Sequence, residues 1–195
     1  MSFKIDTLKL EWIDGNQDNP EDFCLHGQVR LIIGEEIIDD GKEKWTLSVG
    51  AYRMLKSLYY NHLTHIDGLT ENYFLTCCGF QMIILENELY FMDCPSGINW
   101  TVLHEGNMVK LTTISGKETI IPREEYKAAV FAFADEIKAF YDRCSSKTAM
   151  TTLTRQRKFL GRSWYTKPKS VEDKDAKLAH DRFWHDWNCW RNEET

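Results

Sequence analysis

The feature that most constrains this fold is a series of short apolar segments between residues 80 and 121, each ended by turn residues. Within the segments apolar residues alternate with polar ones, as at Ile98, Trp100 and Val102, which is the period of a β-strand. Glycine, asparagine, serine and proline gather in the breaks, where tight turns need them; the breaks are 86–88, 95–97, 105–107 and 115–117. Regular spacing of this kind predicts an antiparallel β-meander.

An amphipathic helix is predicted directly after the meander. Pro122 suits the first helical position, and Glu124 and Glu125 place negative charge at the positive end of the helix dipole. Apolar residues then recur every three or four positions; they are Tyr126, Val130, Phe133, Ile137 and Tyr141. The stripe predicts a helix over residues 122–143 that packs against the sheet.

The remaining patterns complete an α+β fold. Alternation over residues 3–13 and 23–33 predicts two antiparallel strands joined by a long loop. A helix capped by Ser48 and an aromatic helix over residues 171–190 have apolar residues at helical spacing. We therefore predict a single α+β domain over residues 1–195, with an antiparallel sheet of about six or seven strands and three main helices packed on it.

The composition and the first residues indicate the compartment. The chain has 195 residues, of which 43% are hydrophobic and 13% aromatic, unlike a disordered protein. Lys4, Asp6 and Lys9 interrupt the first apolar residues, and no run of about 18 apolar residues occurs, so we predict neither an export signal nor a membrane span. Without an export signal, the six cysteines are expected to be reduced thiols. These features predict a cytoplasmic protein.

Cysteines and histidines form no recognisable catalytic or metal motif. A zinc site needs pairs of ligands separated by two to four residues, whereas Cys77 and Cys78 are adjacent and Cys94 and His104 stand apart. We predict no metal, no cofactor and no catalytic residue, and cysteines that act as small buried apolar side chains. The alternative is a small hydrolase or transferase with a site near Cys94 and His104. A pocket that holds either residue, or His26, beside a carboxylate would favour it.

Charge is divided unevenly along the chain. Residues 1–150 carry 14 basic and 23 acidic side chains, a net charge of −9, whereas residues 151–195 carry 10 and 7, a net charge of +3. Residues 145–170 are predicted to form an irregular basic segment. Such a segment can pack on the acidic body, bind an acidic protein surface or bind single-stranded nucleic acid. The acidic isoelectric point of about 5.5 argues against nucleic acid.

A protein partner is therefore the expected ligand. The residues predicted to contact it are charged or aromatic; they are Asp39, Asp40, Arg155, Arg157, Lys158, Arg162, Trp164 and Tyr165. The two aspartates lie between Gly34 and Gly41, where the sequence predicts a solvated turn. The aromatic helix is expected to pack into the core through Phe183 and its neighbours, although an exposed Trp184 would instead indicate a partner interface.

Three short runs resemble a pattern in uncharacterised bacterial proteins. They are Cys-Cys-Gly-Phe at 77–80, Cys-Pro-Ser-Gly-Ile-Asn-Trp at 94–100, and Phe-Trp-x-x-Trp at 183–187. Some of those proteins resemble immunity proteins of contact-dependent or polymorphic toxin systems, and the resemblance covers about the last two-thirds of this chain. It implies a small acidic cytosolic protein that binds and neutralises a toxin. An acidic face would suit a basic nuclease toxin, through complementary potentials.

Overall fold

The computed structural model describes residues 2–13, 15, 18–20, 22–64, 72–77, 79–93, 96–147, 150–153, 156–159, 162–165, 169–172 and 174–193. Its helices are α1 (Leu47–Lys56), α2 (Arg123–Asp142) and α3 (Lys174–Arg191). Its strands are β1 (Phe3–Glu11), β2 (His26–Ile33), β3 (Glu36–Asp40), β4 (Trp45–Thr46), β5 (Leu75–Thr76), β6 (Gly79–Leu85), β7 (Glu88–Asp93), β8 (Gly97–Ile98), β9 (Trp100–Glu105), β10 (Met108–Thr113), β11 (Glu118–Pro122), β12 (Met150–Leu153), β13 (Gln156–Phe159), β14 (Arg162–Tyr165) and β15 (Lys169–Glu172). The predicted α+β class is confirmed.

The first sheet has the order β1-β2-β3, with β4 paired to β2. Strands β1 and β2 are antiparallel from Phe3 opposite Ile33 onward, which confirms the predicted strand pair. Strand β3 corrects the prediction of a solvated turn between Gly34 and Gly41. Its β-branched residues, Ile37 and Ile38, favour extended backbone, and pairing with β2 outweighs the turn preference of the flanking carboxylates.

The meander is present but is divided between sheets. Strands β9, β10 and β11 form one antiparallel sheet, whereas β6 and β7 form a separate hairpin and β5 pairs with β8. Glu86 and Asn87, which join β6 to β7, both have positive φ, at 50° and 68°. Such a two-residue turn matches the twist of a hairpin. The predicted number of strands was too low because β3 and several short strands had no clear alternation.

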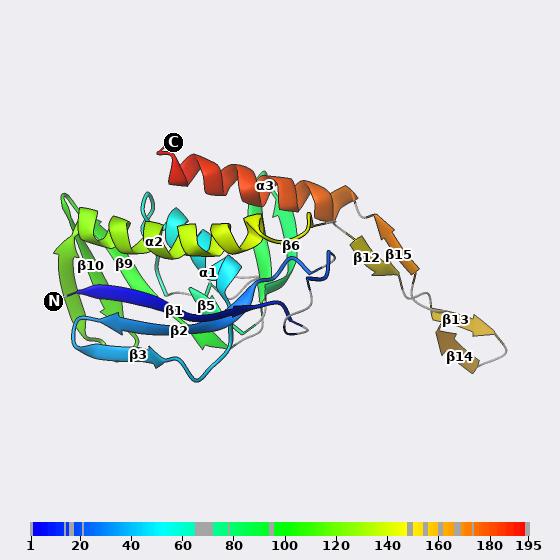
Figure 1. The fold of residues 1–195 in the computed structure, drawn as a ribbon, viewed down its shortest axis with the longest axis horizontal. Helices are drawn as coiled ribbons and strands as arrows, with labels where there is room; N and C mark the ends of the chain where they lie inside the picture. The colour runs from blue at the N-terminus through cyan, green and yellow to red at the C-terminus, as the bar shows by residue number, and fades with distance from the viewer. Residues whose placement is uncertain are drawn as a thin grey trace.

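Helix α1 forms the buried centre of the molecule. All its residues from Leu47 to Leu55 are buried, and it packs against β2, β5, α2 and α3. In Figure 1 α2 lies in front of α1, with the β1–β3 sheet below the two helices and α3 above them. The helix begins one residue earlier than Ser48, with Thr46 at its N-cap position. Ser48 is therefore a buried residue of the first turn and not the cap that the sequence predicted.

Helices α2 and α3 confirm the predicted apolar stripes. In α2 the buried stripe packs on β1, where the rings of Tyr126 and Phe3 meet edge to face at 4.9 Å between centroids. In α3 the buried residues are Ala179, Phe183, Trp187 and Trp190. Trp184 is partly buried and its ring meets Tyr141 of α2 at 5.0 Å, so the aromatic face of α3 belongs to the core.

Asp186 holds α3 against α1, and we expect Asp186→Ala to lower the free energy of unfolding by about 2 kcal/mol. Its carboxylate is 12% exposed and accepts hydrogen bonds from the Tyr52 hydroxyl at 2.8 Å and from Arg182 Nε at 2.6 Å. The alanine variant leaves the buried Tyr52 hydroxyl without this acceptor. Urea unfolding measures the loss, and Asp181→Ala, an exposed carboxylate of the same helix, is the matched control. Equal stabilities of the two variants would contradict this role.

The sequence predicted an irregular segment over residues 145–170, whereas four described stretches between residues 150 and 172 form strands. Strand β12 pairs with β15, and β13 pairs with β14, so the chain runs outward and returns as two successive antiparallel ladders. Threonines and aromatic residues in this stretch favour extended backbone, which explains the difference. Figure 1 shows these four strands extending beyond the start of α3, and β12 contacts that helix. That residues 1–195 form a single domain stays a prediction. No helix among the described residues has the length and apolar character needed to cross a membrane.

Candidate functional site

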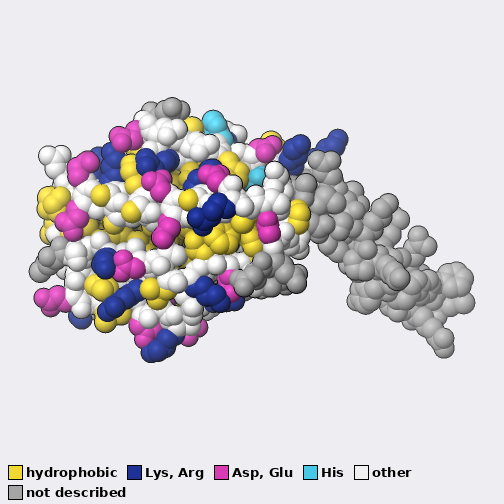
Figure 2. All heavy atoms as spheres, viewed as in Figure 1, with side chains coloured by type: hydrophobic (Ala, Val, Ile, Leu, Met, Phe, Trp, Pro, Cys, Tyr) yellow, Lys and Arg dark blue, Asp and Glu magenta, His cyan; other side chains and the backbone are white. Residues whose placement is uncertain are grey.

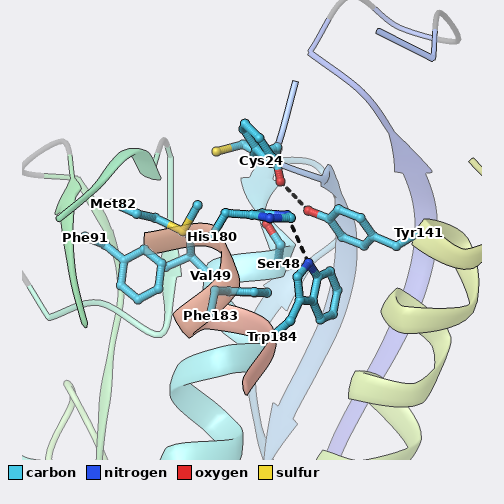
Figure 3. Close-up of a pocket in the computed structure, with 10 residues that line it drawn as sticks. Cys24, Ser48, Val49, Met82, Phe91, Tyr141, His180, Phe183 and Trp184 are labelled. Carbon is cyan, nitrogen blue, oxygen red and sulfur yellow. Dashed lines mark hydrogen bonds between the residues drawn. The ribbon is translucent and has the colours of Figure 1, made fainter. Parts of the chain in front are cut away.

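A small cavity lies where the three helices meet the β6–β7 hairpin (Figure 3). Its walls are mostly aromatic, with a thiol, two hydroxyls and an imidazole among them; they are Phe23, Cys24, Ser48, Val49, Met82, Phe91, Tyr141, His180, Phe183 and Trp184. The cavity volume is about 10 Å³. That volume holds about one water molecule, which is far too little for a substrate.

Hydrogen bonds within the fold hold the polar groups of this cavity. The Tyr141 hydroxyl donates to the Phe23 carbonyl oxygen and accepts from the Leu25 N–H at 3.3 Å. Burial raises the pKa of Tyr141. Trp184 Nε1–H donates to His180 Nε2 at 3.0 Å, so this nitrogen carries no proton, and burial lowers the pKa of His180. The cavity therefore contains a neutral phenol, which ties α2 to the segment just before β2, and a neutral imidazole, which is hydrogen-bonded within α3.

A much larger groove lies beside the first turn of α2, and we call it the α2 groove. Its volume is about 630 Å³, within the range of small-ligand sites. The residues that line it come from the end of α1, the β9–β10 turn, the start of α2 and the segment after α3; they are Leu58, Tyr59, Asn107, Met108, Pro122, Arg123, Glu124, Lys127 and Glu193.

Charged contacts order the wall of the α2 groove. Arg123 Nη2 donates to the Leu58 carbonyl oxygen at 3.0 Å, and the Arg123 backbone N–H donates to the Asn107 carbonyl oxygen at 2.8 Å. Lys127 Nζ lies 2.6 Å from Glu193 Oε1, and this hydrogen bond raises the pKa of Lys127. The groove thus combines apolar surface with two cationic side chains.

Two residues named for the enzyme alternative, His104 and His26, line neither the cavity nor the α2 groove. His104 Nε2 hydrogen-bonds the Ser57 carbonyl oxygen at 2.9 Å, and Cys94 and Cys78 lie outside the described residues. No group of three or more histidine, cysteine or acidic side chains is placed to hold a metal ion in the part of the chain that the structure describes.

His26 does have a carboxylate beside it. Glu11 lies opposite His26 in the β1–β2 register, but its carboxylate pairs with Lys9 at 2.8 Å and with Lys44 at 2.5 Å. The His26 ring is buried, and Nε2 lies 3.3 Å from Thr46 Oγ1. Neither residue lines the cavity or the α2 groove, so this pair belongs to the edge where β2 meets β4.

The two predicted partner-binding aspartates have different environments. Asp39 is 6% exposed, and its carboxylate accepts hydrogen bonds from Trp45 Nε1 at 2.5 Å and from the Gly41 N–H at 2.6 Å. Asp40 is exposed and forms an ion pair with Lys42 at 2.5 Å. Neighbouring residues of a strand point to opposite faces, which separates the pair. Asp39 is therefore engaged within the fold, and only Asp40 is open to a partner.

The predicted basic and aromatic residues of the segment fall mostly in one ladder. The register pairs Arg157 with Trp164 and Gln156 with Tyr165, and Lys158 and Arg162 belong to the same two strands. The structure describes the backbone of these residues, whereas Arg155 lies outside the described residues. The ladder is remote in sequence from Asp39 and Asp40, which lie on β3.

Sequence reasoning missed the α2 groove entirely. Its walls come from four separate stretches between Leu58 and Glu193, and no local pattern links them. The one signal was the pair of cations, Arg123 and Lys127, in the first turns of a helix whose other early charges are acidic. No family model, curated protein or solved structure matches this chain. The candidate sites of the chain are therefore assigned from its own geometry.

Proposed function

We propose that this chain is a non-catalytic partner-binding protein of the immunity type, which binds a protein partner through residues 150–172. We call the four strands β12–β15 the arm. The observation that carries the proposal is the form of the arm: two successive two-stranded ladders that extend beyond the start of α3 (Figure 1).

Strand pairing is the first support. Among the described strands, each strand of the arm pairs with one neighbour only, so no described strand pairs with its outer edge. A two-stranded ladder is marginally stable in water by itself. Unpaired edges are templates for a further strand from another chain. A partner that adds a strand to the arm would pair with such an edge and stabilise the ladder.

Charge is the second support, and it favours an acidic partner surface. Residues 151–170 include Arg155, Arg157, Lys158, Arg162, Lys167 and Lys169 and no acidic residue. On the face of the body in Figure 2, basic and acidic side chains are interspersed instead of forming one acidic field. A concentration of one charge steers a complementary partner and suppresses others. We therefore assign recognition to the arm, where the charge over residues 151–170 has one sign.

The types of residue in the arm are the third support. The register pairs Arg157 with Trp164, and Phe159 with Arg162. Arginine and tryptophan are enriched among the few residues that supply most of the binding energy at protein interfaces. Two cross-strand pairs of a basic and an aromatic residue therefore suit the centre of an interface.

We expect the tagged wild-type chain to retain one stoichiometric protein partner from its native host, released by salt. The double variant Arg157→Glu/Arg162→Glu should weaken this capture at least about tenfold, because arginine anchors are lost and like charges face the acidic partner. Affinity capture with mass spectrometry gives the identity of the partner, and surface binding gives the ratio of affinities.

The matched control is Lys42→Glu/Lys117→Glu, which makes the same change of charge on exposed residues of the body. It should keep the partner. If the arm variant retained the partner as well as the control does, the assignment of recognition to the arm would be wrong. For the immunity role, the captured protein expressed alone should arrest growth, and wild-type chain should restore it. A captured protein that is harmless on its own would contradict that role.

A further inference from the structure

The α2 groove already holds a carboxylate that comes from the chain itself. Glu193 follows the end of α3, and its Oε1 lies 2.6 Å from Lys127 Nζ. Its φ of 62° is in the left-handed region, which a residue with a side chain rarely adopts. The Tyr59 hydroxyl donates to the Trp190 carbonyl oxygen at 2.6 Å and fixes the last turn of α3 beside the groove. The turn after α3 thus delivers one acidic side chain to Lys127.

The balance of charge in the groove changes when Glu193 leaves. With Glu193 in place, Arg123 and Lys127 face two carboxylates, since Glu124 also lies 4.0 Å from Lys127 Nζ. Without it, two cations face Glu124 alone, and the Glu124 side chain is 82% exposed. Leu58, Met108 and Pro122 supply apolar surface beside the cations. The open groove is then complementary to a carboxylate that is flanked by aliphatic groups.

We infer that the α2 groove binds an acidic peptide segment of a protein partner, and that Glu193 occupies the position of its carboxylate in the free protein. Ammonium and guanidinium groups make the stronger, charge-assisted hydrogen bonds to carboxylates. The Glu193 side chain is 57% exposed, and exposed ion pairs contribute little to stability, so an incoming carboxylate can replace it. The site is independent of the arm, because the arm precedes α3 (Figure 1) and the groove is lined by Glu193, which follows the other end of that helix.

The test uses a fluorescein-labelled peptide, Gly-Leu-Glu-Glu-Leu-Glu-Gly, and fluorescence anisotropy with the full-length chain. Glu193→Gln should bind this peptide about fivefold more tightly than wild type, because the internal competitor loses its charge. Adding Lys127→Met to Glu193→Gln should abolish the gain. Glu125→Gln, an exposed change in the same turn of α2 outside the groove, should bind like wild type.

A second peptide, which has glutamine in place of each glutamate, distinguishes binding through charge from binding through apolar contact. Equal binding of the two peptides, or equal affinity of wild type and Glu193→Gln for the acidic one, would overturn the proposal. Sedimentation of Glu193→Gln without peptide tests whether a second copy of this chain occupies the groove instead. Self-association that Lys127→Met reverses would assign the groove to a second copy and overturn the partner segment. Circular dichroism melts of all variants should coincide, since Glu193 and Glu125 are exposed and Lys127 is partly exposed.

Discussion

Replacing Gly27 by alanine is expected to lower the free energy of unfolding by more than about 4 kcal/mol, an exceptional effect for a single methyl group. A Cβ at this position would lie 2.1 Å from the Lys9 carbonyl oxygen and 2.6 Å from Leu47 Cδ1. The oxygen belongs to the backbone of β1, which pairs with β2 here, just past a shift in register. The Leu47 side chain can rotate away, but the clash with the backbone oxygen is relieved only by separating β1 from β2.

Far-UV circular dichroism and urea unfolding of Gly27→Ala measure this effect. The matched control is Gly106→Ala, in the β9–β10 turn, where a Cβ meets no atom within 4 Å and φ is 64°. This control should lose only about 1 kcal/mol, the usual strain of a side chain in left-handed backbone. A Gly27→Ala protein as stable as Gly106→Ala would mean that the close approach of β1 and β2 is not as the structure has it.

Lowering the pH from 6.5 to 4 is expected to remove about 3 kcal/mol of stability through His62. Its ring lies against Phe74, with 3.9 Å between centroids and the ring planes tilted by 31°, and Nε2 lies 2.8 Å from Asn99 Oδ1. Burial, with a smaller contribution from the positive charge of Arg53, lowers the pKa of His62 from 6.5 to about 4. The folded protein therefore keeps this imidazole neutral where the unfolded chain has already protonated it.

The sign of the pH dependence follows from the proton count. Between pH 6.5 and 4 the unfolded state binds more protons at this site, so the full contribution is present above pH 6.5 and decreases as the pH falls toward 4. Burial also lowers the pKa of His26 and His180, which adds to the effect in the same direction. Urea unfolding at a series of pH values gives the free energy of unfolding as a function of pH. Between pH 6.5 and 4 this free energy should change less steeply with pH for His62→Gln than for wild type. An unchanged slope would exclude His62 as a source of acid sensitivity.

Local signals allowed much of the fold to be predicted. Helix α2 runs from Arg123 to Asp142, one residue inside each predicted end, because Pro122 sets its start and an uninterrupted apolar stripe sets its extent. The breaks of the meander were predicted for the same reason: a turn such as Gly106, with φ of 64°, needs a particular residue type. Such signals depend on a few neighbouring residues and survive in any tertiary context.

Features set by distant contacts could not be predicted. Asp39 resembles any surface carboxylate in the sequence, and only the fold brings Trp45 Nε1 to it. Strand β3 depends on its pairing with β2. The ladders of the arm likewise depend on pairing between strands, and no local sequence pattern indicates their register. The α2 groove requires a contact between Glu193 and Lys127, and the whole arm and α3 separate these two residues in the sequence. Because the candidate sites of this chain arise from such long-range contacts, local sequence patterns could not predict them.

Hydrogen exchange of the captured complex, compared with the free chain, tests the central claim most directly. A two-stranded ladder alone opens readily, so the amides of β12–β15 should exchange much faster than those of α1 in the free protein. Binding should slow exchange throughout the arm and leave the β1–β2 ladder unchanged. If the partner slowed exchange elsewhere on the body and left the arm as it was, the arm would not be the recognition element and the proposed function would have to be assigned to another surface.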